Sequence, residues 1–292
     1  MSETPAAPRN PPPPPPRPGH GQAGLRRAFV TLVTNADFAI GAGALLRSLR
    51  ETGTEAELVV MHTGGVPESA LRALEARGAQ LHAVELLPTS DAFNTAHAKD
   101  RIHGLNPFTK GTKPPFHTPL DNFAKLRLWQ LPHDRVVFLD ADTLVLRNID
   151  RLFDYPELCA APNVYESLAD FHRMNSGVFT ARPSQTTFER LLARLDSPGA
   201  YWPRTDQTFL QAAFPDWHGL PVFDNLLQYV WLNLPRLWSW EQVRVLHYQY
   251  EKPWTDHAKA DRLRVLIDLW RAHAGDGPLP DLSSLPPPPE TR

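Results

Sequence analysis

Residues 135–145 read Arg-Val-Val-Phe-Leu-Asp-Ala-Asp-Thr-Leu-Val, and this stretch decides the class of fold. The apolar run 135–139 predicts a buried β-strand, which ends on Asp140-Ala141-Asp142. Because alternate residues of an extended chain point the same way, Asp140 and Asp142 can present two carboxylates together. Open α/β sheets bind ligands just beyond the carboxyl ends of their strands. Two carboxylates there, together with ligand phosphates, suit a hard divalent cation such as Mn²⁺ or Mg²⁺.

The chain on the amino-terminal side of this stretch alternates between strand and helix patterns. Short β-branched apolar runs predict strands, and apolar residues at helical spacing between turn signals predict helices. The predicted order is a strand at 28–34, a helix between Asn35 and Gly53, a strand at 58–61, a helix from Pro67-Glu68 to Gly78, and a strand at 81–86. This order predicts an α/β fold, with a mainly parallel sheet flanked by helices.

The segment 88–120 breaks this alternation. It is rich in His, Lys, Thr and Pro and lacks a sustained period, which is typical of a functional or mobile loop. Regular patterns then resume, and they predict a helix at 123–131, a strand at 176–180, helices at 184–195 and 206–214, a strand at 243–248 and a helix at 259–272.

Proline marks the two ends of the chain. The sequence contains 31 prolines in 292 residues, and much of the excess lies in Pro11–Pro16 and Pro286–Pro289. We therefore expect a disordered Pro-rich tail at 1–25, one domain at 26–274, and a second Pro-rich tail at 275–292.

Composition and charge exclude several classes of protein. The net charge is −2 and basic residues are interleaved with acidic ones, so no nucleic-acid-binding surface is expected. No apolar run reaches the roughly 18 residues of a membrane span, and the N-terminus lacks the apolar stretch of a signal peptide. The single cysteine, Cys159, leaves no intramolecular disulfide, so a cytoplasmic protein is expected. A weak candidate partner is an SH3-type domain, because Pro12, Pro15 and Arg17 fit its loose ligand pattern.

Three interpretations of Asp140-Ala141-Asp142 are open from the residues alone. The two aspartates can form a turn and a helix N-cap. They also resemble the nucleophile motif of haloacid-dehalogenase-type phosphatases, with Asp140 attacking phosphate and Asp142 acting as acid and base, although that motif normally opens its domain. The third interpretation is the metal-binding DxD motif of a nucleotide-sugar glycosyltransferase.

Other motifs favour the third interpretation. The segment Phe138-Leu-Asp-Ala-Asp-Thr-Leu-Val-Leu-Arg-Asn-Ile-Asp-Arg-Leu-Phe153 resembles, almost residue for residue, the DxD region of glycosyltransferase family 8, the glycogenin-like family. Segments resembling the family's other motifs lie before and after this one, in the order in which they occur in the family. They are Phe29–Asn35, Lys125-Leu126 with Trp129, Asn175–Phe179, Asp206-Gln207, and His247-Tyr248 with Lys252-Pro253-Trp254. The resemblance covers about residues 28–256. It implies a GT-A nucleotide-diphospho-sugar transferase fold in a single domain.

The resemblance also implies a role for each matching residue. Asp140, Asp142 and His247 would ligate Mn²⁺ or Mg²⁺, and Lys252 would hold a phosphate oxygen. The remaining donor contacts would be Thr34, Asn35 and Phe38 around uracil, Lys125 at the diphosphate or donor sugar, Asn175, Asp206 and Gln207 at sugar hydroxyls, and Ala141 and Ser176 beside them.

The implied reaction is Mn²⁺-dependent, retaining transfer of a hexose of glucose or galactose type from a UDP-sugar to a hydroxyl acceptor. Asp206 or Gln207 would support the positive charge on the sugar, and Lys125 would assist departure of UDP. The acceptor is a saccharide, a small polyol or a protein, and the oligomeric state is not indicated. The segment 88–120 would close over UDP and exclude water. The alternatives are the phosphatase that uses Asp140, and a UDP-sugar binder without catalysis.

Three departures from the family pattern limit the resemblance. Asn163 stands where family members often carry an acidic residue after Ala-Ala-Pro. The segment after the metal histidine is one residue shorter and reads Tyr248-Gln249-Tyr250-Glu251. No tyrosine aligns with the self-glucosylation site of glycogenin, although Tyr229 is nearby. We therefore expect an external acceptor, with self-modification at Tyr229 as the open alternative.

Overall fold

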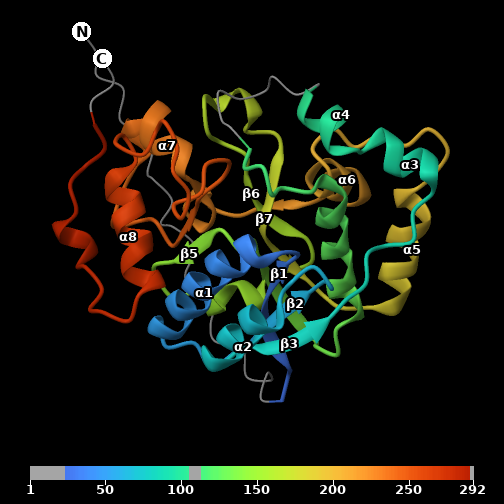
Figure 1. Ribbon diagram of the computed structural model, residues 1–292, viewed down its shortest axis with the longest axis horizontal. Coiled ribbons are helices and arrows are strands. Elements are labelled where there is room, and N and C mark those ends of the chain that lie inside the picture. Colours follow the sequence, from blue (N-terminus) through green and yellow to red (C-terminus); the bar gives the residue numbers. More distant parts are fainter. Residues whose placement is uncertain (1–23, 105–112, 290–292) are drawn as a thin grey trace, which may run out of the picture.

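The centre of the molecule is a seven-stranded sheet, seen in a computed structural model that describes residues 24–104 and 113–289 (Figure 1). Neighbouring strands follow the order β3 (Gln80–Ala83), β2 (Glu57–His62), β1 (Arg27–Val33), β4 (Arg135–Leu139), β7 (Met174–Ala181), β6 (Cys159–Pro162) and β8 (His218–Gly219). The pairs from β3 to β4 are parallel, and β7 runs antiparallel to both of its neighbours. The predicted mainly parallel α/β sheet is confirmed.

Helices cover both faces of this sheet because its central strands are apolar on both sides. In β1, Ala28 and Val30 join one hydrophobic cluster, whereas Phe29 and Val33 join the other. Burying each such large side chain contributes about 1.5–3 kcal/mol. The helices on the first face are η1 (Pro119–Gln130, a 3₁₀ helix), α5 (Gln185–Leu195) and α6 (Asp206–Ala213), and those on the second are α1 (Ala36–Glu51) and α2 (Glu68–Ala76).

A second, smaller sheet lies against the carboxyl end of β4. Its strands follow the order β5 (Thr143–Val145), β10 (Val245–His247) and β9 (Leu226–Leu227). It packs with α7 (Gln228–Asn233) and α8 (Arg264–Ala274), and α8 lies beside α1 (Figure 1). The sequence predicted β10 as part of a longer apolar run at 243–248, but it did not predict β5 or β9.

Short elements occupy the connections. In the segment 88–120, α3 (Asp91–Ala96) and α4 (Lys99–Gly104) precede residues 105–112, which lie outside the described part of the chain. The remaining short helices are η2 (Asp150–Asp154), η3 (Leu168–Asp170), η4 (Val222–Asp224), η5 (Pro235–Leu237) and η6 (Leu282–Ser284). The predicted closure of this segment over a ligand stays a prediction.

The carboxyl-terminal residues that are described contact the domain. Arg47 on α1 donates hydrogen bonds to the carbonyls of Gly275 and Gly277, and Trp240 donates to the carbonyl of Pro286 at 2.8 Å. The amino-terminal proline run and its SH3-type motif lie outside the described residues. Among the described helices, none has the length and apolar character needed to cross a bilayer.

Candidate active site

The end of β4 is held in a tight turn that sets the two aspartates. The backbone N–H of Asp140 donates to the carbonyl of Gly177 on β7 at 2.8 Å. Thr143 donates to the carbonyl of Asp140 twice, from its N–H at 3.1 Å and its Oγ1 at 2.8 Å. The chain therefore leaves the large sheet at Asp140 and enters the small sheet at Thr143, which leaves Asp140 and Asp142 at the junction of the two sheets.

Strand pairing in the small sheet brings His247 to the same point. β10 runs antiparallel to β5, with His247 opposite Thr143, and the N–H of Tyr248 donates to the carbonyl of Asp142 at 2.8 Å. These backbone hydrogen bonds thus hold Asp142 and His247 next to each other, although the two residues are 105 positions apart in the sequence.

The three side chains form a cluster that fits a divalent cation. One ligand atom from each of Asp140, Asp142 and His247 lies within 4.8 Å of the others, and Nε2 of His247 is 3.3 Å from Oδ1 of Asp142. Nδ1 of His247 contacts Oδ1 of Asn225 at 3.0 Å, while Nδ2 of Asn225 donates to Asn175. This orientation of Asn225 places the imidazole proton on Nδ1, so the lone pair of Nε2 faces the two carboxylates. Two carboxylates and a neutral imidazole are suitable ligands for Mn²⁺ or Mg²⁺.

Lys252 lies against the same cluster. Its Nζ donates to Oδ2 of Asp142 and, at 2.9 Å, to the carbonyl of Tyr248. Burial favours the neutral acid of Asp142, but the contact with the ammonium of Lys252 more than offsets this effect and holds the pKa of Asp142 well below its ordinary value. Asp142 is therefore ionised and available as a ligand at neutral pH.

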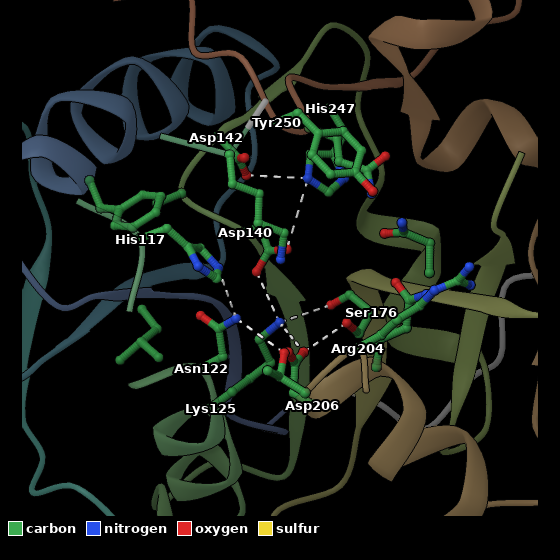
Figure 2. Close-up of a pocket in the computed structure, with 18 of the residues that line it drawn as sticks. His117, Asn122, Lys125, Asp140, Asp142, Ser176, Arg204, Asp206, His247 and Tyr250 are labelled. Carbon is green, nitrogen blue, oxygen red and sulfur yellow. Dashed lines mark hydrogen bonds and ion pairs between the residues drawn. The ribbon is translucent and has the colours of Figure 1, made fainter. Parts of the chain in front are cut away.

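Lys125, on η1, connects the cluster to α6. Its Nζ lies 3.0 Å from Oδ1 of Asp140 and 2.7 Å from Oδ2 of Asp206, and Ser176 donates to the same Oδ2 at 2.7 Å. Burial alone would lower the pKa of Lys125, but the two carboxylates raise it above its ordinary value, so the ammonium stays charged. Burial raises the pKa of Asp140, against the nearby ammonium. Figure 2 shows these groups facing one another across the site.

One cavity of about 470 Å³ joins these residues, a volume typical of small-molecule sites. The residues nominated from the sequence that line it are Thr34, Phe38, Lys125, Asp140, Ala141, Asp142, Asn175, Ser176, Asp206, Gln207, His247 and Lys252. Asn35 is absent from that lining. Its Oδ1 instead caps α1 by accepting from the N–H of Phe38 at 3.1 Å, and its Nδ2 donates to the carbonyl of Phe116 at 3.1 Å.

The cavity also contains residues that sequence reasoning did not nominate. They are chiefly Lys113, His117, Asn122, Tyr165, Arg204 and Tyr250. Asn122 donates to Oγ1 of Thr205 at 3.2 Å. On its other side it contacts His117, as Figure 2 shows, with 3.3 Å between its Nδ2 and Nε2 of the imidazole. Three signals could have indicated them: the cationic loop before η1, the position of Arg204 two residues before Asp206, and the departure from the family pattern at Tyr250.

Tyr229 is far less accessible than self-modification requires. Its side chain is 2% exposed, and it does not belong to the described residues that line the cavity. Its hydroxyl donates to Oε2 of Glu251 at 2.5 Å and accepts from Nζ of Lys259 at 2.5 Å. Burial, with the Glu251 carboxylate, raises the pKa of Tyr229 above its ordinary value, so its hydroxyl stays neutral. A sugar could reach this oxygen only after the surrounding core opened.

Known proteins resemble this chain in both sequence and fold. Residues 29–258 match Glycosyl transferase family 8. Human glycogenin-1 is 37% identical over 239 residues, which is 78% of this chain and 62% of that protein. UDP-glucuronate:xylan alpha-glucuronosyltransferase 2 of Arabidopsis thaliana is 32% identical over 240 residues, which is 78% of this chain and 36% of that protein. The chain thus spans little more than a third of the plant relative.

A solved structure shows the same fold. The galactosyltransferase LgtC, in complex with donor and acceptor sugar analogs, superposes with a TM-score of 0.59 at 17% identity, covering 90% of this chain and 98% of that one. The GT-A fold expected from the sequence motifs is therefore confirmed.

Proposed function

Since the chain belongs to glycosyltransferase family 8, we propose that it transfers a hexosyl group from a UDP-sugar to a hydroxyl acceptor with retention of configuration, assisted by Mn²⁺ or Mg²⁺. The observation that carries the proposal is the convergence of Asp140, Asp142 and His247 with two buried lysines in one cavity. Family membership makes the chain a transferase, which favours this function over a phosphatase that uses Asp140 as nucleophile. The relatives act on different donors and acceptors, so the sugar comes from none of their names.

The residues divide the work of the reaction. Asp140, Asp142 and His247 would hold the cation, which as a Lewis acid neutralises charge on the diphosphate of the donor when bound. Lys252 would contact a phosphate oxygen as a point charge, and its bond to the carbonyl of Tyr248 fixes its position. Lys125 would lie between the leaving diphosphate and the donor sugar.

Asp206 suits the role of electrostatic stabiliser better than that of covalent nucleophile. Its Oδ2 accepts from Lys125 and Ser176, and its Oδ1 accepts from Oγ1 of Thr205 at 2.9 Å. Three donors lower the nucleophilicity of a carboxylate but leave its negative charge beside the sugar. We therefore assign Asp206 to the support of an oxocarbenium-like sugar, with Gln207 binding a hydroxyl. The acceptor hydroxyl would then attack the face from which UDP departs.

The proposal is tested by measuring UDP release from a panel of UDP-sugars, with and without Mn²⁺ and with saccharide, polyol and protein acceptors. We expect metal-dependent release with at least one donor. Asp142→Asn should weaken metal-dependent UDP binding by about 100-fold or more, because it removes a charged ligand. Asp276→Asn is the matched control, since that side chain is 95% exposed. Release of phosphate from phosphomonoesters without any UDP affinity would contradict the proposal.

A further inference from the structure

We propose that Gln228 is a positioning residue for Lys252, and that its side-chain amide acts by holding residues 249–251 in one turn conformation. The inference rests on the proposed function, because it explains how the site presents Lys252 to a phosphate of the donor. Gln228 is not among the described residues that line the cavity, so its effect on a donor must pass through the backbone of this turn.

Strand pairing places Gln228 beside the turn. β9 runs parallel to β10, with Leu227 opposite His247, so the chain leaves both strands at the same end of the small sheet. Gln228 directly follows Leu227 as the first residue of α7, and it is 1% exposed. Its side chain is therefore shielded from solvent at the point where the chain turns from His247 toward Lys252.

The amide of Gln228 donates to the turn twice. Its Nε2 lies 2.6 Å from the carbonyl oxygen of Gln249 and 2.9 Å from that of Glu251. These two carbonyls flank Tyr250, and neither residue belongs to a strand or a helix. A buried carbonyl that loses its donor costs free energy, and a primary amide carries two hydrogens on one nitrogen. The Gln228 side chain thus matches the two acceptors that this turn presents.

Tyr250 shows why the turn has to be held. Its φ is 67°, in the left-handed region that bulky residues rarely adopt, and such residues persist only where their surroundings fix them. The ring lines the cavity and packs edge-on against Tyr165 and Tyr229, with centroid distances of 6.3 and 5.7 Å. Figure 2 shows Tyr250 at the end of the site where Asp142 and His247 lie.

The conformation of Tyr250 sets the direction of Lys252, which follows two residues later. Nζ of Lys252 donates to Oδ2 of Asp142 and, at 2.9 Å, to the carbonyl of Tyr248. If Tyr250 relaxed to a negative φ, the backbone that carries Lys252 would rotate and its ammonium would leave these two acceptors. We therefore expect loss of the Gln228 amide to weaken the contact between Lys252 and the donor.

A neighbouring contact supplies the matched control. The hydroxyl of Tyr229 donates to Oε2 of Glu251 at 2.5 Å, and Nζ of Lys259 donates to Oε1 at 2.7 Å. These contacts hold the side chain of Glu251, whereas Gln228 holds its carbonyl. Tyr229→Phe therefore removes a buried hydrogen bond from the adjacent residue of α7 while the two carbonyls keep their donor.

The test measures Mn²⁺-dependent UDP binding by isothermal titration calorimetry on the full chain, below the melting temperature of every variant. Gln228→Met keeps the length of the side chain and removes both donors, and it should weaken UDP binding about tenfold or more. Gln228→Asn keeps the amide one methylene shorter; it should show a smaller loss, and it replaces Gln228→Met if that variant does not fold. Tyr229→Phe should change the affinity by less than about twofold.

A second background separates positioning from a merely structural role. Tyr250→Gly lets the turn adopt a positive φ without steric cost, and its own UDP affinity is the reference for this background. Adding Gln228→Met to Tyr250→Gly should weaken UDP binding by less than about threefold, because the strain that the amide opposes is gone. Thermal unfolding should show that Gln228→Met lowers the melting temperature in both backgrounds.

The outcomes separate the two proposals. Unchanged UDP affinity in Gln228→Met, or an equal loss in Tyr229→Phe, would overturn the inference and leave the proposed function standing. A full tenfold loss that persists in the Tyr250→Gly background would also overturn it, since the amide would then not act through the left-handed turn. Absence of Mn²⁺-dependent UDP binding by the parent protein would instead overturn the proposed function.

Discussion

Gly177 is the position where the smallest change should disturb the candidate metal cluster most. A Cβ added at this residue would lie 2.4 Å from Cε1 and 2.6 Å from Nδ1 of His247, and 2.9 Å from Oδ1 of Asn175. Normal contacts between such atoms are about 3.5–4.0 Å, so the methyl group of Gly177→Ala would overlap the imidazole by about 1 Å.

Neither the backbone of Gly177 nor the imidazole of His247 can move easily to relieve this overlap. The carbonyl of Gly177 accepts from the N–H of Asp140 at 2.8 Å, and its own N–H donates to Oδ1 of Asn175 at 2.9 Å. The imidazole is 4% exposed and is held through Nδ1 by Asn225. Overpacking of this kind costs about 1–3 kcal/mol, which corresponds to a fall in melting temperature of roughly 2–10 °C for a domain of this size. Displacing a ligand by this amount should weaken metal-dependent UDP binding about 10–100-fold.

The assay combines thermal unfolding with calorimetric titration of UDP in the presence of Mn²⁺. Gly219→Ala is the matched control, because Gly219 lies in the same sheet and a Cβ there would meet no atom within 4 Å. The control should stay within about 0.5 kcal/mol of the parent protein. If Gly177→Ala binds Mn²⁺ and UDP with unchanged affinity, His247 is not a ligand in the position described, and the reasoning about this cluster fails.

Three further predictions concern buried polar side chains. Lys125→Met should destabilise the fold by about 3–5 kcal/mol, because it leaves buried carboxylates without their cation. The loss of stability should be smaller at pH 5 than at pH 8, because burial raises the pKa of Asp140. Denaturant titration at both pH values measures this loss, and an equal loss at both would contradict the explanation. Tyr229→Phe should retain sugar transfer at a cost of about 1 kcal/mol in stability, because it removes the hydrogen bond to Glu251. The intact mass of the parent protein should show no attached hexose, because Tyr229 is buried. A hexose adduct that Tyr229→Phe removes would refute the buried position of this side chain. Burial lowers the pKa of His97, and its Nε2 accepts from the N–H of Trp202 at 2.9 Å, so the folded state binds fewer protons than the unfolded chain and stability should fall as the pH drops through about 6.5. In His97→Gln, the melting temperature should depend less on pH between 8 and 5, and an unchanged pH profile would count against this role.

The sequence predicted those parts of the fold that have a long, clear period. The strands at 27–33, 57–62 and 135–139 and the helices at 36–51 and 185–195 are apolar on the faces that they bury, so the pattern alone identifies them. The short strands β5, β6, β8 and β9 are held by their neighbours rather than by their own sequences. Long-range hydrogen bonds, such as the one from Cys159 N–H to Oγ1 of Thr180 at 2.9 Å, cannot be read from local sequence.

The residues of the cavity likewise divide into those that the sequence predicted and those that it did not. The structure brings most of the residues in family motifs together around one cavity, because each motif lies at a strand end or a helix start. The side chain of Asn35, expected at the uracil, caps α1 in the structure, and its contact with a nucleotide stays a prediction. Lys113, Arg204 and Tyr250 come from irregular segments, whose approach to the cavity depends on tertiary packing and on positive φ values at Thr205 and Tyr250.

The geometry of the small sheet explains why the metal-type cluster is tied to so few residues. Opposite side chains in a strand pair change faces with every residue, so a slip of one position between β5 and β10 would turn His247 away from Asp142. Two bonds fix the register at the ends of this pair: the N–H of Leu146 donates to the carbonyl of Arg244 at 2.7 Å, and the N–H of Tyr248 donates to that of Asp142 at 2.8 Å. The cluster therefore depends on backbone register, which a motif preserves, whereas other residues of the cavity come from loops that can change without disturbing it. We expect relatives with this DxD motif to share a metal and a nucleotide but to differ in the sugar they transfer, according to the residues that their loops place in the cavity.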